Sequence, residues 1–477
     1  MSPLLPALIL LPAVGSGLAY LFRAPAPRSV VLLGIAAMHA VLVASLWLTP
    51  PLAGPGDWLG VDPLGLVVLS VVSLLFLVVS SYAIGYLRHE PPRGGRVFVT
   101  GLLGFLAAAS LVALSQHLAL LWVGMETTTL ALAPLVYHHR DRRSLEAVWK
   151  YLLLSSVGIA LALFGTFFLA AAQAQGRPLL LPDLVAGARG LEPSLLRSAF
   201  IFLLVGYGTK MGLAPLHSWK PDTYGEAPSL VGGLMAGALT SCAFLGVARI
   251  TEVVAAAGLL SFAQPLLLGF GMVSLLVAAA FMIGQTDLKR LLAYSSVEHM
   301  GLLVLGLGLG GGGAYGTVLH LVNNALTKGV VFLAVGNVVL ATGSASAQHT
   351  RGMLRRLPVS GVLLFLGLFA VTGSPPFGPF LSEFTLLQAA FAQGHPWIAL
   401  GVVLLLAIIF VGMAAALLEV LYAPSEGEAP EPVRESWWLV GGPILLLAGV
   451  LVLGLWVPPG LHVVLQQAAV RLGGGLP

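Results

Sequence analysis

The sequence predicts an all-α protein with about 14 membrane-spanning helices. Of its 477 residues, 58% are hydrophobic and 9% are charged, whereas soluble domains carry about 25% charged residues. The mean hydropathy is +0.97. Apolar runs of about 20 residues, the length with which a helix crosses the hydrocarbon, recur along the chain. These three observations exclude a water-soluble globule.

Charge and cysteine content exclude further classes of protein. The formal net charge of +4 is spread over predicted loops without a basic stripe for a phosphate backbone, so nucleic acid is not an expected partner. The chain has one cysteine, Cys242, which excludes a disulfide framework, a zinc cluster or an iron–sulfur cluster held by this chain alone. We therefore expect neither a metal nor a cofactor site within it.

The predicted spans follow one another through short loops. Arg23 follows the first apolar run and no positive charge precedes it, which is the wrong polarity for a cleavable signal peptide, so this run counts as a span. The most polar stretch, residues 424–435, is expected to be a solvated acidic loop. The expected spans are 4–22, 30–49, 62–87, 97–116, 118–137, 147–172, 197–216, 228–250, 258–283, 288–309, 314–341, 358–391, 396–421 and 437–457.

The basic residues assign an orientation through the positive-inside rule. With the N-terminus outside, 15 basic residues lie in inner loops, Lys220 among them, and 5 lie in outer loops or the tail, Arg249 among them. The remaining three of the 23, Lys150, Lys210 and Lys328, lie inside spans. We expect a multi-pass protein of the inner (cytoplasmic) membrane, with both termini outside the cytoplasm.

Ionisable groups inside spans are the candidate functional residues, because a central charge costs about 2.5–3.5 kcal/mol and faces a bundle interior or a water-filled cavity. Glu126 lies far from either end of the fifth span. Lys150 lies near the start of the sixth and could snorkel instead. In the seventh span, Gly212 and Pro215 should break the helix beside Lys210, as happens where a span lines a cavity. Glu126 would set the protonation of Lys210; a structural ion pair is the alternative.

A second break is expected in the twelfth span. Pro375, Pro376 and Pro379 interrupt it, and Glu383 follows Pro379 by one turn. Two interrupted spans, each with one ionisable group beside the break, indicate two related halves of the chain. Such paired interruptions point to a transport site.

Further polar groups lie in the tenth and eleventh spans, between the two breaks. His320, Asn324 and Lys328 recur at spacing four and share one helix face. This row suits a water-assisted proton wire, with a polar seam between helices as the alternative. Glu298 and His299 lie on the preceding span, where His299 alone could equally be a hydrogen-bonded core histidine.

Four motifs then make a specific resemblance. They are GTKMGLAPLHSWKPDTYGEAPS (208–229), LAYSSVEHMG (292–301), HLVNNALTK (320–328) and GSPPFGPFLSEF (373–384). Over about residues 60–420 the chain resembles the antiporter-like subunits of respiratory complex I, of group 4 membrane-bound hydrogenases and of Mrp cation/proton antiporters. The resemblance implies 14 helices, two inverted five-helix repeats, and discontinuous helices 7 and 12. The corresponding regions are helices 1–3 in 1–96, the repeats in 97–250 and 251–421, and the acidic loop with the last helix in 422–477.

The resemblance also implies roles for individual residues. The expected proton-transfer residues are Glu126, Lys210, His320, Lys328 and Glu383, with Lys150, His299 and Glu298 as secondary candidates. One departure concerns the eighth helix, where many relatives carry a bridging lysine and this chain offers only Thr240, Ser241 and Cys242, so water or hydroxyls must bridge. This departure, the EHMG motif and the short C-terminal end place the chain nearest the F-type component of hydrogenase-4, with the M-type component of complex I next.

The expected function is that of a proton-translocating membrane subunit of a redox-driven complex. Protons would enter near Lys210, cross by way of His320 and Lys328, and leave near Glu383. Iron–sulfur, nickel–iron or quinone sites are expected only in partner subunits. Other membrane subunits of a hydrogenase or complex I-like assembly are expected partners. An Mrp-type Na⁺(K⁺)/H⁺ antiporter component is one alternative. A non-transporting scaffold, or half of an inorganic-carbon uptake pair, is the other.

Overall fold

Helices make up almost the whole molecule. In the computed structural model, residues 3–48, 56–89, 94–173, 178–423 and 433–473 are described. Helix accounts for 84% of the described residues, which contain three isolated β-bridges but no β-strand. In a chain this apolar, helices satisfy every backbone N–H and C=O without water. The predicted all-α class is confirmed.

Among the described residues, twelve helices are long and apolar enough to cross a membrane. Each corresponds to a predicted span, with ends that differ by a few residues. One of them, Ser229–Ala256, consists of α10 and α11 joined by a π-helical turn over Met235–Leu239. The helices are α1 (Leu4–Leu21), α2 (Pro25–Leu48), α3 (Pro63–Tyr86), α4 (Gly95–Leu114), α5 (Leu118–Val136), α6 (Arg142–Ala172), α10 (Ser229–Leu234) with α11 (Thr240–Ala256), α12 (Leu260–Met282), α13 (Leu288–Leu309), α14 (Gly312–Thr342), α18 (Pro396–Tyr422) and α19 (Trp437–Leu455).

The two interrupted segments each consist of two helices that meet at a break. The first is α8 (Pro193–Met211) followed by α9 (Trp219–Glu226), and the second is α16 (Pro358–Val371) followed by α17 (Gly378–Ala392). Each break contains a cis proline, at Ala214–Pro215 and at Pro375–Pro376. Proline lacks the N–H that would continue the helix, so both breaks lie where the prolines predicted them.

Short helices complete the chain. They are α7 (Leu181–Ala186), α15 (Met353–Arg356) and α20 (Pro459–Arg471). The sequence did not predict α20, which follows Pro458. Residues 424–432 of the expected acidic loop lie outside the described residues. Glu435, just beyond them, accepts a hydrogen bond from the Val359 N–H at 2.7 Å at the start of α16.

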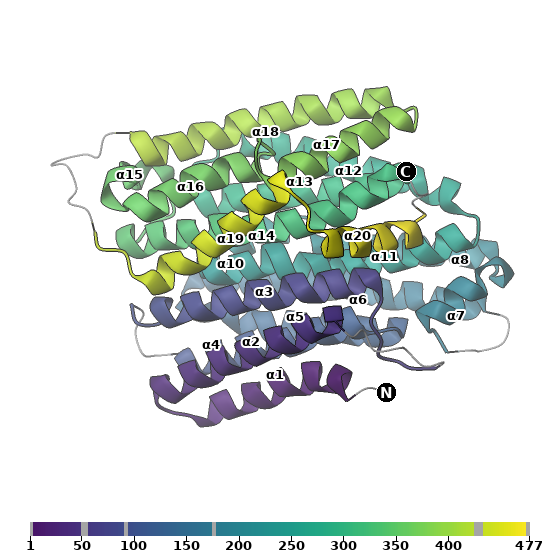
Figure 1. Ribbon diagram of the computed structural model, residues 1–477, viewed down its shortest axis with the longest axis horizontal. Coiled ribbons are helices and arrows are strands. Elements are labelled where there is room, and N and C mark those ends of the chain that lie inside the picture. The colour runs from purple at the N-terminus through teal and green to yellow at the C-terminus, as the bar shows by residue number, and fades with distance from the viewer. Residues whose placement is uncertain (1–2, 49–55, 90–93, 174–177, 424–432, 474–477) are drawn as a thin grey trace.

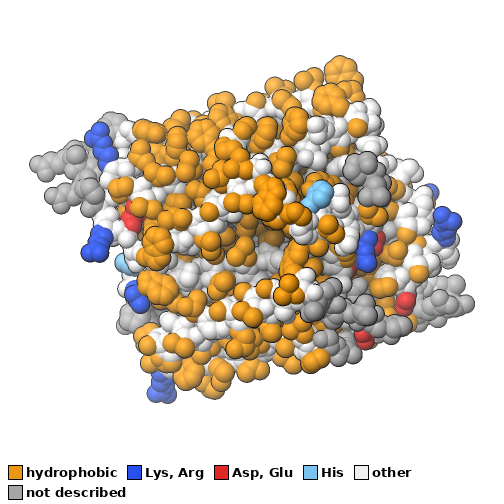
Figure 2. Space-filling view, viewed as in Figure 1, with side chains coloured by type: hydrophobic (Ala, Val, Ile, Leu, Met, Phe, Trp, Pro, Cys, Tyr) orange, Lys and Arg blue, Asp and Glu red, His pale blue; other side chains and the backbone are white. Residues whose placement is uncertain are grey.

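The helices lie side by side from α1 at one edge to α18 at the other, and α19 returns across α14 (Figure 1). We call the end that holds α15 and the start of α6 the basic end; the other end, which holds α7 and the N-terminus, is the opposite end. On the face shown in Figure 2, hydrophobic side chains cover the middle and Lys and Arg side chains lie towards the two ends. This distribution is typical of a protein whose middle lies in hydrocarbon.

Two basic residues that the sequence assigned to loops are buried instead. Lys220 lies on α9 with 0% of its surface exposed, because the interrupted span continues through α9, beyond its predicted end at residue 216. Arg249 is 1% exposed on α11, which continues to Ala256, beyond the predicted end of its span. It donates to Asp62 Oδ2 at 2.6 Å at the opposite end of the bundle. Both residues are corrections to the predicted loop assignment.

Candidate functional site

Lys210 is buried in the last turn of α8 among hydroxyl groups. Its Nζ donates to Thr129 Oγ1 at 2.5 Å and to the Tyr151 hydroxyl at 3.2 Å. Gly206 allows α8 to approach α6 this closely, since a Cβ there would lie 2.6 Å from the backbone of Gly158. Among the described residues, Lys210 forms no ion pair.

Glu126 is linked to Lys210 through a single hydroxyl. The Thr129 Oγ1 that accepts from Lys210 lies 3.4 Å from Glu126 Oε2, and Ser156 Oγ lies 3.4 Å from Oε1. The structure therefore brings Glu126 and Lys210 together as expected, although indirectly. Glu126 is half-buried and Ser156 is exposed, so the carboxylate reaches the lateral surface of the bundle in the middle of α5.

Lys150 lies at the surface near the basic end. Its side chain is 44% exposed and pairs with Asp222 Oδ2 at 2.7 Å and with Glu146 Oε1 at 2.8 Å. Asp222 also pairs with Arg290 at 2.8 Å. Because Asp222 belongs to α9, these pairs tie the segment after the first break to α6 and α13. This position agrees with the snorkelling alternative for Lys150.

Lys328 and Glu298 lie in the centre of the bundle. Lys328 is fully buried on α14, and its Nζ donates to Ser295 Oγ on α13 at 2.6 Å. Glu298 follows Ser295 by one turn, is 1% exposed, and its charge interacts with that of Lys328. The neighbouring serine, Ser296, accepts from Lys220 Nζ at 2.9 Å. Lys220 was expected in a loop, and its place in the motif beside Lys210 was the signal in the sequence that it belongs to the site.

His299 and His320 form a directly hydrogen-bonded pair. His299 Nδ1 lies 2.9 Å from His320 Nε2, His299 Nε2 lies 3.1 Å from the Val371 carbonyl, and His320 Nδ1 lies 2.9 Å from Ser382 Oγ. Since a carbonyl only accepts, a neutral His299 carries its hydrogen on Nε2. A neutral His320 must then donate through Nε2 to His299 Nδ1 and can accept at Nδ1. The single hydrogen of the Ser382 hydroxyl can go either to His320 Nδ1 or to the Pro379 carbonyl, each 2.9 Å away. The direction of the hydrogen bonds is therefore fixed from His320 through His299 to the Val371 carbonyl.

Glu383 completes this cluster at the second break. It is buried on α17, and one of its oxygens lies within 4.8 Å of a nitrogen of each histidine of the pair. Gly373, with φ +61°, leaves room for the carboxylate, which a Cβ at this position would overlap. Three such donors could hold a metal ion, but hydrogen bonds occupy all four ring nitrogens. The arrangement therefore favours transfer of a proton.

The hydroxyls of the eighth span, which were expected to bridge the proton path, donate hydrogen bonds within their own helix instead. Thr240 Oγ1 donates to the Ala236 carbonyl and Ser241 Oγ to the Gly237 carbonyl, each at 2.6 Å. Cys242 Sγ lies 4.0 Å from the Ala109 carbonyl. These groups therefore do not supply a connection between Lys210 and Lys328.

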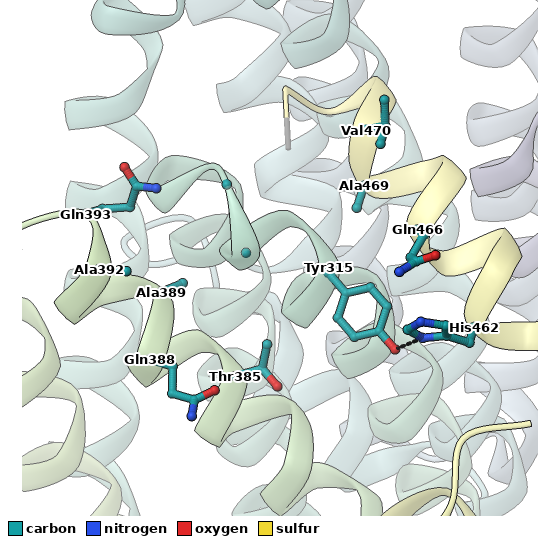
Figure 3. Close-up of a pocket in the computed structure, with 12 residues that line it drawn as sticks. Tyr315, Thr385, Gln388, Ala389, Ala392, Gln393, His462, Gln466, Ala469 and Val470 are labelled. Carbon is teal, nitrogen blue, oxygen red and sulfur yellow. Dashed lines mark hydrogen bonds between the residues drawn. The ribbon is translucent and has the colours of Figure 1, made fainter. Parts of the chain in front are cut away.

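A cavity of about 400 Å³ opens at the opposite end, between α14, α17 and α20 (Figure 3). Its lining is mainly apolar, with polar groups from Tyr315, Thr385, Gln388, His462 and Gln466, and the Tyr315 hydroxyl lies 2.7 Å from His462 Nδ1. Thr385 follows Glu383 by two residues on α17. The cavity and the buried carboxylate therefore share helix α17 but lie on different faces of it.

Comparison with known proteins agrees with this arrangement. Residues 115–409 match the family described as NADH:quinone oxidoreductase/Mrp antiporter, TM. A hydrogenase-4 component F homolog of Methylacidiphilum infernorum is 33% identical over 449 residues, covering 90% of this chain and 92% of that protein. The family match includes both breaks and every candidate residue from Glu126 to Glu383.

Two solved structures share the fold. A chain of the archaeal membrane-bound sulfane sulfur reductase has a TM-score of 0.90 and 21% identity, with 98% of each chain covered. A chain of the Mrp complex from Dietzia sp. DQ12-45-1b has a TM-score of 0.87 and 19% identity, covering 99% of this chain and 98% of that one. Both structures are multi-subunit membrane complexes.

Proposed function

Because the chain belongs to the NADH:quinone oxidoreductase/Mrp antiporter transmembrane family, we propose that it moves protons as a subunit of a redox-driven membrane complex. The proposal rests on one observation, which is a row of buried ionisable groups. The lysines of this row donate hydrogen bonds to hydroxyls and form no ion pairs among the described residues. The row runs from Lys210 through Lys328 to the cluster of His299, His320 and Glu383. Buried charges in spans mark ion paths by default.

The proposed path uses the two breaks as half-channels of opposite orientation. The chain enters the first break along α8 from the opposite end and the second along α16 from the basic end. We assign α4–α11 and α12–α18 to two inverted repeats, which with α1–α3 and α19 give 14 spans. Protons reach Lys210 from the basic end beside α9. They leave from Glu383 into the cavity at the opposite end, which faces outward if the basic end is cytoplasmic.

Glu126 is the proposed point of coupling to a neighbouring subunit. An ionised carboxylate exposed to lipid in the middle of a span is costly, and Glu126 is half-buried at the lateral surface. A partner subunit that covers this surface removes that cost and can change the charge near Glu126. Because Thr129 contacts both Glu126 and Lys210, such a change alters how tightly Lys210 binds a proton.

The groups along the path favour H⁺ over Na⁺ as the transported ion. Hard cations prefer oxygen ligands, whereas most of the buried groups here are lysine and histidine nitrogens. The redox centres that drive transport belong, in this proposal, to partner subunits. The similarity to a hydrogenase-4 component F homolog favours a hydrogenase-type complex.

Reconstitution of the purified complex into liposomes tests this function. A pH-sensitive dye reports proton movement while electron transfer is followed separately. Wild-type complex should transport protons, and Lys210→Ala should abolish transport while partner subunits that carry iron–sulfur centres still co-purify. Undiminished transport by Lys210→Ala would refute the proposal.

A further inference from the structure

Lys220 is a buried lysine near the boundary between the two halves of the chain, and the neighbouring eighth span contains no lysine. It is fully buried on α9. Its aliphatic chain crosses Gly212, the residue with φ +75° that ends α8, and a Cβ on Gly212 would overlap Cδ and Cε of the lysine. Gly212 follows Lys210 by two residues. The aliphatic part of the Lys220 side chain therefore passes beside the backbone two residues after Lys210, the first proposed proton carrier.

The other end of the side chain reaches α13. Lys220 Nζ donates to Ser296 Oγ at 2.9 Å and to the Ser296 carbonyl at 3.3 Å. The preceding residue, Ser295, accepts from Lys328 Nζ at 2.6 Å. Two consecutive serines of α13 thus accept hydrogen bonds from the amino groups of two lysines, one on α9 and one on α14. The charges of these lysines are close enough to interact.

The hydrogen bonds of Lys220 suit a group that gains and loses a proton. A buried lysine with a purely structural role is usually paired with a carboxylate, but within the described chain Lys220 has no ion pair. Its other neighbour is the Tyr224 ring, 5.9 Å from Nζ. A neutral amine has two N–H bonds, and the two Ser296 oxygens can accept both. The lone pair is then free to take a proton.

We propose that Lys220 is the proton-carrying link between Lys210 and Lys328, in place of the bridging lysine that the eighth span lacks. The inference rests on the proposed function. A proton leaves the Lys210 ammonium, which becomes an amine, and binds the lone pair of the Lys220 amine, which becomes an ammonium. Lys220 then gives up a proton along the Ser296 and Ser295 hydroxyls to neutral Lys328. No bond other than N–H and O–H changes.

Substitutions at Lys220 in the full complex, reconstituted in liposomes, test the link. Lys220→Met removes the amine and should lower proton transport about tenfold or more. Lys220→Arg keeps the positive charge but cannot be deprotonated, so a carrier role predicts the same loss, whereas a structural role predicts recovery. Lys220→His can titrate and should restore part of the rate. Thr223→Val is the control. It removes a hydroxyl on the same helix that donates to the Trp219 carbonyl one turn earlier, and the variant should transport protons normally.

The outcomes separate this inference from the proposed function. If Lys220→Arg or Lys220→Met transports at the wild-type rate while Lys210→Ala does not, the link is wrong and the proposed function stands. If Lys210→Ala also transports normally, the proposed function fails as well. Should the Lys220 variants fail to assemble, Ser296→Ala keeps the lysine and removes one acceptor. A transport rate with Ser296→Ala equal to the wild-type rate would then refute the link.

Discussion

His299 Nδ1 lies 2.9 Å from His320 Nε2, and the two rings stack with their centroids 5.0 Å apart. The residues are 21 positions apart in sequence and belong to neighbouring helices. Their outer nitrogens reach Ser382 and the Val371 carbonyl on either side of the second break. In the proposed path a proton passes through both rings, so the loss of either ring should interrupt transport.

Replacement of His320 by glutamine should therefore lower proton transport about tenfold or more, because the amide cannot relay a proton between its two ends. Dye-based transport in liposomes measures the loss. His39→Gln is a matched control, since His39 is buried between Ser73 and Ser110, both 2.9 Å away, outside the path. Equal effects of the two substitutions would indicate that the His320 phenotype arises from damage to the fold.

The link through Thr129 predicts a selective effect of Glu126→Gln. Removal of the carboxylate charge takes away the attraction that favours a charged Lys210, so proton transport should fall while electron transfer by the complex continues. The ratio of protons moved to electrons transferred measures this uncoupling. Thr127→Val is the control, because Thr127 is exposed on the same helix and its hydroxyl bonds only to the Val123 carbonyl. An unchanged ratio in Glu126→Gln would contradict the coupling role.

Gly373→Ala should impair transport without removing any titratable group. The new Cβ would overlap the Glu383 carboxylate and displace it from the histidine pair. Gly343→Ala separates this effect from backbone strain, because Gly343 also has a positive φ, +71°, but has no atom within 4 Å of the added Cβ. Transport by Gly373→Ala should be the lower of the two. Equal rates would mean that the position of Glu383 does not limit transport.

The sequence predicted the parts of the site that depend on local pattern. Glycine and proline identified both breaks, and spacing four placed His320 and Lys328 on one buried face of α14. Contacts between distant segments were not predictable in this way. The segment that contains Lys220 is polar and short, so its sequence resembles that of a loop. Its burial follows from the packing of α9, the second half of the interrupted span, inside the bundle. The pairing of His299 with His320 likewise depends on how two helices are rotated against each other.

The buried pair of Asp62 and Arg249 should matter for stability rather than for transport. Asp62→Asn leaves a buried guanidinium uncompensated, which costs roughly 3–5 kcal/mol. Cys242, the only cysteine of the chain, is buried, so the rate at which a thiol-reactive dye labels it on heating reports unfolding. The melting temperature of the variant should fall. An unchanged melting temperature would show that the pair contributes little.

The same pair predicts a loss of stability in acid. Burial alone would raise the pKa of Asp62, but Arg249, the Gly65 N–H and the Gln116 amide lower it below its usual value. A carboxyl with a lowered pKa contributes stability above the pKa of its unfolded state, about 3.9, and this contribution is lost as the pH falls through the folded-state value. The wild type should therefore lose more stability than Asp62→Asn in that range. Parallel pH profiles would contradict the assignment.

Single-cysteine labelling tests both the cavity and the orientation. Because Cys242 is buried, a membrane-impermeant maleimide should label only introduced cysteines. Gln388→Cys, at the exposed rim, and Thr385→Cys, deeper in the cavity, should both react from outside the cell if protons leave there. Arg143→Cys, exposed at the basic end, should react only after the membrane is permeabilised. The reverse pattern would invert the proposed direction of transport, and protection of Thr385→Cys alone would show that water does not reach the region beside Glu383.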